Sequence, residues 1–383
     1  MNVLSFFKKS ILLLCVGLAV TACSSDNNDE PENGRLDADK TAILKQYVNS
    51  VLVPTYKSLA DAAVELNDLC ATLKANPTQE NVQKCCDKWI ETRKYWERSE
   101  AFLFGAVEDY YIDPHIDSWP LQKTQLDNVL ANADLMSQLS ADGASAQGFA
   151  NLGYGLLGFH AIEYVLFRNG AARSVSDISS NELIYNSAVA QDLMWQCIRL
   201  EASWTGIDNM SAAKSKLLQD NGLEPSMNYG ETFLNAGQSG NTLYKTQLAA
   251  MEQILQGASD IADEVGNTKI TDPVNSGNVL DVESWYSWNS IADFTDNLRS
   301  VRNAYYGSLD STVNANSMAA WMQKNYPAND TAVRSAIVDA INTVAKMPAP
   351  FRNHLTKAET ADAVAACNKL MSALDNAITA MNK

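Results

Sequence analysis

Apolar residues recur every three or four positions along most of the chain, which is the spacing of one face of a helix. The first such run covers residues 36–75, where Pro54 is expected to kink the helix or split it in two. A second helix is predicted from Thr78, a suitable N-cap, toward Phe104. Gly105 is placed to end that helix.

The same period continues to the C-terminus. Residues 113–120 are predicted to be irregular, because proline occupies both position 114 and position 120. No stretch alternates with the two-residue period of a strand, so the predicted fold class is all-α, with antiparallel helical bundles. Further helices are predicted at residues 121–139, 181–204, 212–219, 242–265, 290–306, 317–323, 331–346 and 358–381.

One apolar stretch carries two polar residues that need partners. Residues 151–170 are predicted to be helical, and His160 and Glu163 then lie side by side on one face. Burying such groups without hydrogen bonds or a metal costs roughly 2–7 kcal/mol or more. Three glycines precede the pair within six residues, which indicates close approach by another backbone or by a ligand: Gly153, Gly155 and Gly158.

The segment from Gly158 to Glu163 has the form G-x-H-x-x-E, which resembles the imelysin family. Residues 96–105 (WERSEAFLFG), 115–120 (HIDSWP) and 284–307 resemble the same family in the same order. The resemblance implies two helical bundles packed side by side, here residues 36–170, which carry the motif, and 171–383. It makes a distant duplication more credible, although chance likeness between amphipathic helices is compatible with the same pattern.

The His and carboxylate pair suggests a metal site. Nitrogen and oxygen ligands of this kind suit iron, manganese or zinc. Two ligands are too few for tight binding, so Glu100 and either Asp117 or His115 are candidates to complete the site with His160 and Glu163. Glu100 is equally compatible with a surface ion pair, and the two loop residues with bracing of the loop.

Two residues of a C-terminal helix are further candidates to line this site. Asp293 and Arg299 would reach it across the boundary between the bundles, but an ion pair on the helix surface explains them at least as well. His354 lies outside the motifs and is interpreted as a capping or surface residue.

The resemblance implies a protein tied to iron uptake, like the substrate-binding part of a ferrous-iron importer, with iron as the expected ion. A metal-dependent hydrolase with Glu163 as base is an alternative, since the family has been associated with peptidases. An inverted zincin needs H-x-x-E-H, however, and Tyr164 stands where the second histidine belongs. Proteolysis is therefore disfavoured.

A binding module for a small organic or glycan ligand is the third interpretation. Tryptophans could line its pocket, although in a bundle they are more often core residues. The candidates are Trp89, Trp96, Trp119, Trp285 and Trp288.

The N-terminus has the pattern of a lipoprotein signal peptide. Residues 1–22 hold two lysines before an apolar run, and Cys23 follows as the site of lipid attachment. Residues 23–35 are polar and acidic and are predicted to be a disordered tether. We expect an outer-membrane lipoprotein, surface-exposed or facing the periplasm, that meets the membrane only through its lipid and has an outer- or inner-membrane iron transporter as a potential partner. An ordinary cleaved secretory peptide is the alternative.

The charge of the chain argues against nucleic acid as a partner, and its cysteines allow a disulfide. The net charge of −16 becomes −18 without Lys8 and Lys9, and such a surface repels nucleic acid. Five cysteines remain after Cys15 and Cys23, and a disulfide from Cys70 to Cys85 or Cys86 is compatible with an exported hairpin. The other two are Cys197 and Cys367.

Overall fold

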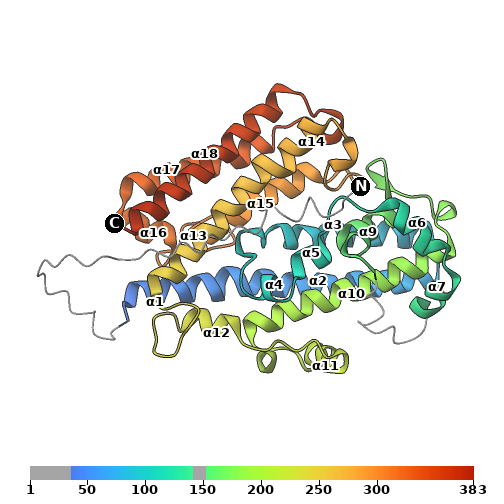
Figure 1. Ribbon diagram of the computed structural model, residues 1–383, viewed down its shortest axis with the longest axis horizontal. Helices are drawn as coiled ribbons and strands as arrows, with labels where there is room; N and C mark the ends of the chain where they lie inside the picture. Colours follow the sequence, from blue (N-terminus) through green and yellow to red (C-terminus); the bar gives the residue numbers. More distant parts are fainter. Residues whose placement is uncertain (1–35, 141–151) are drawn as a thin grey trace, which may run out of the picture. The chain divides into compact units, whose positions relative to one another are not determined.

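The computed structural model describes residues 36–140 and 152–383, so the predicted signal peptide, Cys23 and the tether lie outside the described residues. Within this part, helices make up nearly all regular structure (Figure 1). Two short strands, β1 (Phe167–Arg168) and β2 (Ala171–Ala172), form an antiparallel pair. The predicted all-α class is confirmed.

The helices up to residue 205 pack mainly around α2, α3, α9 and α10. α2 and α3 form an antiparallel hairpin that turns at residues 76–78, and α10 packs along α2 and against α9 (Figure 1). The α-helices of this part are α1 (Ala38–Tyr47), α2 (Val53–Ala75), α3 (Gln79–Glu97), α4 (Ala106–Asp109), α5 (Ile112–Ile116), α6 (Lys123–Ala131), α7 (Ala133–Ser140), α9 (Gly158–Leu166) and α10 (Ser180–Thr205).

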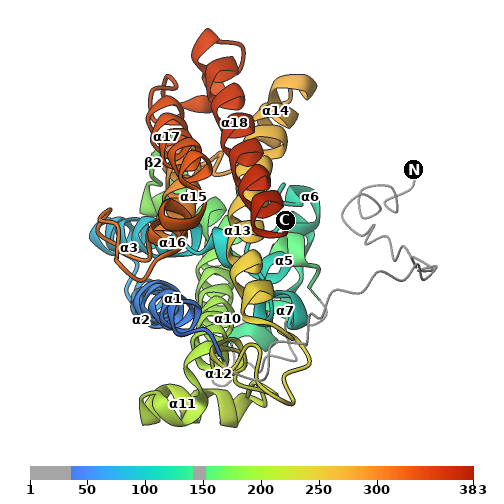
Figure 2. The same ribbon diagram turned by 90° about the vertical axis from the view of Figure 1, so that its left-hand side faces the viewer.

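The C-terminal helices form a second group, in which α13 packs against α15 and α18, and α17 packs against α15 and α18 (Figure 2). They are α13 (Gln247–Glu264), α14 (Thr271–Ser276), α15 (Ser290–Tyr306), α16 (Met318–Asn325), α17 (Pro327–Val344) and α18 (Ala358–Met381). The two helices between the groups in sequence, α11 (Ala212–Asn221) and α12 (Tyr229–Leu234), pack against α10 of the first group. Short 3₁₀ turns are η3 (Glu100–Phe102), η4 (Tyr154–Leu156), η5 (Val175–Asp177), η6 (Ile207–Asn209), η8 (Val279–Asp281) and η9 (Phe351–Asn353), and π-helical segments are η2 (Val48–Leu52) and η7 (Val265–Ile270).

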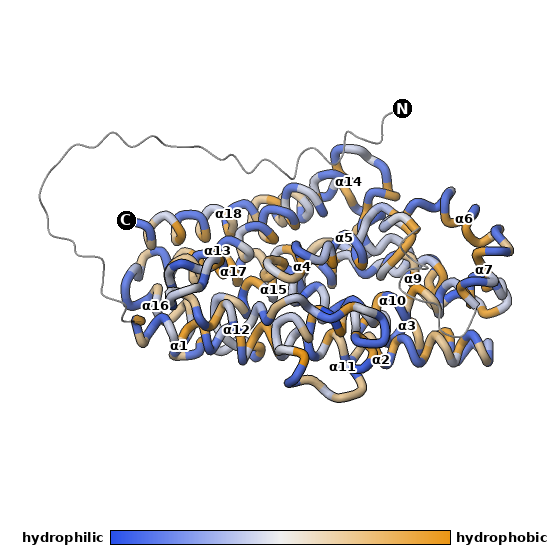
Figure 3. The backbone as a smooth tube through the Cα atoms, turned by 60° about the horizontal axis from the view of Figure 1, so that its bottom comes forward, coloured by the Kyte–Doolittle hydropathy of each residue, from blue (hydrophilic) through white to orange (hydrophobic). Residues whose placement is uncertain are grey.

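The two groups meet where α3 and η3 pack against α15 and α13. The prediction divided the chain at residue 170, but α10 packs with the helices that precede that residue. Long helices carry apolar and polar residues in alternation along their length, as amphipathic helices do (Figure 3). Among the described residues, every helix is too short or too polar to cross a bilayer.

Several local predictions need correction. The run 36–75 is divided into α1 and α2 as expected, but the division is the π-helical segment η2 rather than Pro54 itself. The proline stands in the first turn of α2, where it needs no N–H partner. Residues 113–120 are not wholly irregular, because Pro114 likewise lies in the first turn of α5. The predicted helix 121–139 is divided at Asn132, whose side chain accepts a hydrogen bond from the backbone N–H of Leu135 in α7.

The second helix is shorter than predicted. α3 ends at Glu97 rather than near Phe104, and the hydroxyl of Ser99 donates to the carbonyl of Trp96 at that end. The chain then turns through η3, which places Glu97 and Glu100 at the junction with the C-terminal helices. This early stop positions two carboxylates of the candidate site.

The five cysteines of the described chain are buried free thiols. Cys70 lies on α2, and Cys85 and Cys86 lie on α3, so the hairpin brings these two helices together as expected. No disulfide joins the cysteines within residues 36–140 and 152–383.

Candidate metal centre

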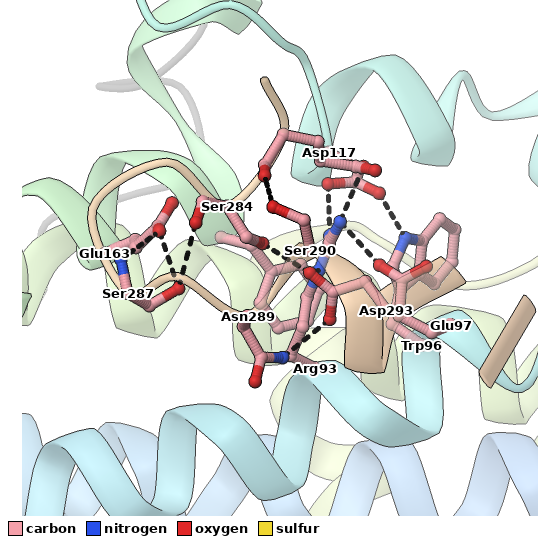
Figure 4. Close-up of polar contacts among 12 residues, drawn as sticks. Arg93, Trp96, Glu97, Asp117, Glu163, Ser284, Ser287, Asn289, Ser290 and Asp293 are labelled. Carbon is pink, nitrogen blue, oxygen red and sulfur yellow. Dashed lines mark hydrogen bonds and ion pairs between the residues drawn. The ribbon is translucent and has the colours of Figure 1, made fainter. Parts of the chain in front are cut away.

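His160 and Glu163 are adjacent on the buried helix α9. His160 Nδ1 lies 3.0 Å from Glu163 Oε2, and neither side chain is exposed. The other Glu163 oxygen, Oε1, accepts hydrogen bonds from the backbone N–H groups of Tyr286 at 3.0 Å and Ser287 at 2.7 Å. The Ser287 hydroxyl donates to it as well, at 2.7 Å (Figure 4). Glu163 therefore holds the imidazole in place and attaches α9 to the segment before α15.

The opposite nitrogen of His160 faces Asp117, from the loop after α5. Nε2 lies 3.1 Å from Asp117 Oδ1, close enough for an ion pair but without the alignment of a hydrogen bond. Trp119 packs edge-on against the imidazole, with ring centroids 4.6 Å apart. Asp117 Oδ2 accepts a hydrogen bond of 2.7 Å from Trp96 Nε1. The loop after α5 thus contributes both a carboxylate and an aromatic ring that lie against His160.

Arg93, on α3, lies among carboxylates and is fully buried (Figure 4). Its guanidinium pairs with Asp117, lies 2.5 Å from Glu97 Oε1 and donates to Glu283 Oε1 at 2.7 Å. Nε lies 3.9 Å from Asp293 Oδ2. One guanidinium is therefore shared among four acids.

A second cation, Lys269, approaches from η7. Its Nζ lies 2.9 Å from Glu283 Oε1. With protonated His160 there are three positive groups, whereas six buried carboxyl groups surround them: Glu97, Glu100, Asp117, Glu163, Glu283 and Asp293. If all six ionise, three negative charges remain without a partner, and a low-dielectric interior tolerates such an excess poorly.

The pKa values reflect this crowding. Burial alone would lower the pKa of His160, but the carboxylates of Asp117 and Glu163 outweigh it and raise the pKa to about 9. Burial also favours a higher pKa for Asp117, yet Arg93 and His160 lower it below its usual range. Burial raises the pKa of Asp293 to about 7.

Burial affects the pKa values of Glu97 and Glu100 in the same way. Burial raises the pKa of both well above the ordinary value of 4.5. Ionisation of these acids therefore depends on additional positive charge.

Several buried polar atoms here lack hydrogen-bond partners among the described residues. They are His160 Nε2, Glu97 Oε1, Glu100 Oε1, Glu283 Oε2, Arg93 Nε and Asn297 Oδ1. Such atoms are uncommon in native interiors, and a cluster of them is explained by a water or an ion at the site. Asp117, His160 and Glu283 each offer one potential ligand atom, and these three atoms lie within 4.8 Å of one another, as metal ligands would.

The predicted site residues divide into two groups. His160, Glu163, Asp117 and Asp293 meet at this cluster, and Glu100 joins it through Asp117. Glu100 is 4% exposed and has no ion-pair partner within the described chain, so the surface-pair alternative is wrong.

Two predicted candidates lie away from the cluster. His115 pairs through Nε2 with Asp192 Oδ2 at 2.7 Å, and Arg299 pairs with Asp296 at 2.8 Å on its own helix. Arg299 therefore forms an ion pair on the helix surface, which was the alternative interpretation of this residue. His354, left outside the site by the sequence, bonds to the Pro350 carbonyl at 2.9 Å.

The sequence interpretation missed Arg93, Glu97, Glu283 and Lys269. Arg93 and Glu97 are four residues apart on α3, which would have signalled an ordinary helix-surface pair. Glu283 directly precedes the family-like segment 284–307. Nothing local distinguishes Lys269, because its role follows from packing between distant segments.

Comparisons with known proteins identify the family of the chain. A family model described as Imelysin matches residues 52–377. The chain belongs to the imelysin family. Iron-regulated protein A of Synechococcus elongatus is 26% identical over 378 residues, which covers 98% of this chain and 93% of that protein.

Solved imelysin structures share the fold. A crystal structure described as an iron-regulated protein A precursor from Parabacteroides distasonis is 28% identical, with a TM-score of 0.78, and the match covers 92% of this chain and 97% of that one. An imelysin-like protein from Psychrobacter arcticum is 15% identical, with a TM-score of 0.57 and coverage of 89% and 92%, and it supports the fold alone.

In this imelysin the first residue of G-x-H-x-x-E has a steric role. Gly158 has φ +73° and is the first residue of α9, so Gly153 and Gly155 precede this helix rather than lie within it as predicted. A Cβ at Gly158 would lie 1.9 Å from the carbonyl oxygen of Ile116. The expected close backbone approach is therefore present, and it brings the residue before Asp117 against the start of α9.

Proposed function

We propose that this imelysin captures a divalent metal ion, with iron as the physiological ion, at His160 Nε2, Asp117 and Glu283. The observation that carries the proposal is the set of buried donor atoms that form no hydrogen bond with the described residues, next to an excess of buried acid. Mixed nitrogen and carboxylate donors suit iron, manganese or zinc. Iron is chosen because two relatives are named iron-regulated proteins.

Glu163 has a different role from the one expected from the sequence. Its oxygens are already engaged by His160 Nδ1 and by the Tyr286–Ser287 segment, so we assign it to orienting the imidazole. A carboxylate that accepts the Nδ1 proton fixes the tautomer in which Nε2 is free to bind a metal. A divalent cation at Nε2 would replace the proton that His160 carries in the ion-free protein.

Capture also requires access, because His160 and Glu163 are fully buried. The segment from Glu283 to Asn289 covers them, and Trp119 Nε1 donates a 2.9 Å hydrogen bond to the carbonyl of Asp281 just before it. Displacement of this segment would expose the site, and its return would enclose the ion. Capture followed by hand-over fits a protein that serves iron uptake.

The cellular setting is part of the same proposal. A lipid on Cys23 would hold the protein at the outer membrane, on the cell surface or facing the periplasm, near an outer- or inner-membrane iron transporter. The lipoprotein-like pattern of residues 1–23 supports the lipid anchor, and the relatives named iron-regulated proteins support the link to iron.

A purely structural ion cluster is the alternative to a metal site. It accounts for the pairs of Arg93 but leaves Glu100 Oε1 and Glu283 Oε2 without partners in the described chain. Anaerobic titration calorimetry with Fe²⁺ separates the two accounts. We expect His160→Ala to lose at least 10-fold in affinity, and His354→Ala, a matched histidine away from the cluster, to bind like the wild type. Absence of Fe²⁺, Mn²⁺ and Zn²⁺ binding by the wild type would refute the proposal.

A further inference from the structure

A second group of carboxylates adjoins the His160 centre. Glu97 ends α3, Glu100 begins η3, and Asp117 comes from the loop after α5. One carboxylate oxygen of each lies within 4.8 Å of the other two. Asp117 belongs to this group and also to the group formed with His160 and Glu283.

Acidic clusters on protein surfaces are common and imply no ligand, but this one is buried. Glu97 is 0% exposed and Glu100 is 4% exposed. Glu100 Oε1 is inaccessible to solvent and has no hydrogen-bond partner in the part of the chain that the structure describes. An ionised carboxylate oxygen in that setting is costly unless a positive group that does not belong to the chain approaches it.

The nearby basic groups do not meet this need. The Arg93 guanidinium lies 2.5 Å from Glu97 Oε1, but it is shared with Asp117, Glu283 and Asp293. Lys269 Nζ lies 2.9 Å from Glu283 Oε1 and 3.8 Å from Glu264 Oε1, so its ion pairs are with these two acids rather than with Glu97 or Glu100. The amide of Asn297 donates to Glu97 Oε2 and Arg93 pairs with Glu97 Oε1, which leaves Glu100 Oε1 for a further positive partner.

We propose that Glu97, Glu100 and Asp117 form a second cation position, so that Asp117 bridges two bound ions. This inference rests on the proposed function, which supplies the first ion at His160. The two positions differ in chemistry, because the second offers only carboxylate oxygen. It therefore favours hard divalent cations such as Mn²⁺, and the pair forms a carboxylate-bridged centre.

Mn²⁺ is a suitable probe, because it is stable in air and paramagnetic. Calorimetry and metal analysis of the full wild-type protein should give two Mn²⁺ per chain, with an electron paramagnetic resonance spectrum of two coupled ions. Glu100→Gln keeps the size of the side chain and removes its charge, so it should bind one Mn²⁺ and give the spectrum of an isolated ion. Glu224→Gln, at an exposed glutamate, should retain both ions.

The outcomes separate the two proposals. One Mn²⁺ in the wild type, lost in His160→Ala and unchanged in Glu100→Gln, would overturn the second position and leave the proposed function standing. No Mn²⁺, Fe²⁺ or Zn²⁺ in the wild type would overturn both. The wild-type stoichiometry needs no variant to fold, so the inference is tested even if Glu100→Gln is unstable.

Discussion

The protonation of His160 gives a prediction that needs no metal. The pKa of this residue is raised to about 9, because the carboxylates of Asp117 and Glu163 outweigh the effect of burial. The ordinary value is 6.5. Since each pKa unit corresponds to about 1.4 kcal/mol, the protonated imidazole stabilises the fold by about 3 kcal/mol. The folded pKa is the higher one, so this stability is fully present below pH 6.5 and is lost as pH rises through 9.

Glu163→Gln is the perturbation that isolates this effect. It removes one of the two charges that hold the imidazolium and places an amide where a carboxylate accepted the Nδ1 proton. We expect the pKa of His160 to fall by about 1–3, the usual effect of an adjacent opposite charge. The stability lost between pH 6 and pH 10 should shrink accordingly relative to the wild type.

The assay is nuclear magnetic resonance of histidine-labelled protein in the presence of a chelator. The chain has three histidines, and His160→Gln identifies the signal of interest. Urea unfolding at the two pH values gives the stability, and Glu224→Gln serves as a control at an exposed site. A His160 midpoint at or below 6.5 in the wild type, or one unchanged in Glu163→Gln, would refute the reasoning.

Two further predictions concern stability and are tested by urea unfolding. Arg93→Ala leaves several buried carboxylates without their guanidinium and should cost roughly 3–5 kcal/mol, with part of the loss recovered by millimolar Mn²⁺. Arg98→Ala, which breaks a partly exposed pair, should cost under about 1 kcal/mol; equal losses in the two variants would contradict the buried network. Gly158→Ala should cost more than about 2 kcal/mol, because its backbone is left-handed and a Cβ would collide with the Ile116 carbonyl. Gly153→Ala meets nothing within 4 Å and should change stability little; similar effects of the two glycine variants would count against the close approach.

Helical periodicity predicted most of the fold. The predicted helices 181–204, 290–306 and 358–381 match α10, α15 and α18 closely, because each presents a continuous amphipathic pattern. The end of α3 was missed, since no glycine or proline marks residue 98 and the helix stops through local capping by Ser99. Boundaries set by such contacts leave little trace in the sequence.

The candidate site was predicted only in part, for a related reason. His160 and Glu163 stand out because polar residues are rare in an apolar helix, and local spacing already places them together. Arg93 and Glu283 are 190 positions apart, and only the packing of α3 against the C-terminal helices joins them. The distinction between a ligand and a positioning acid at Glu163 depends on the amides of Tyr286 and Ser287, which no sequence pattern reveals.

Anomalous diffraction from crystals grown with Mn²⁺ or Fe²⁺ tests the central claim most directly. The account predicts a peak within bonding distance of His160 Nε2, Asp117 and Glu283, with Glu163 still bonded to Nδ1. A fully ordered cluster with Arg93 between Asp117 and Glu283 and no anomalous peak beside His160, at ion concentrations that saturate binding in solution, would contradict it.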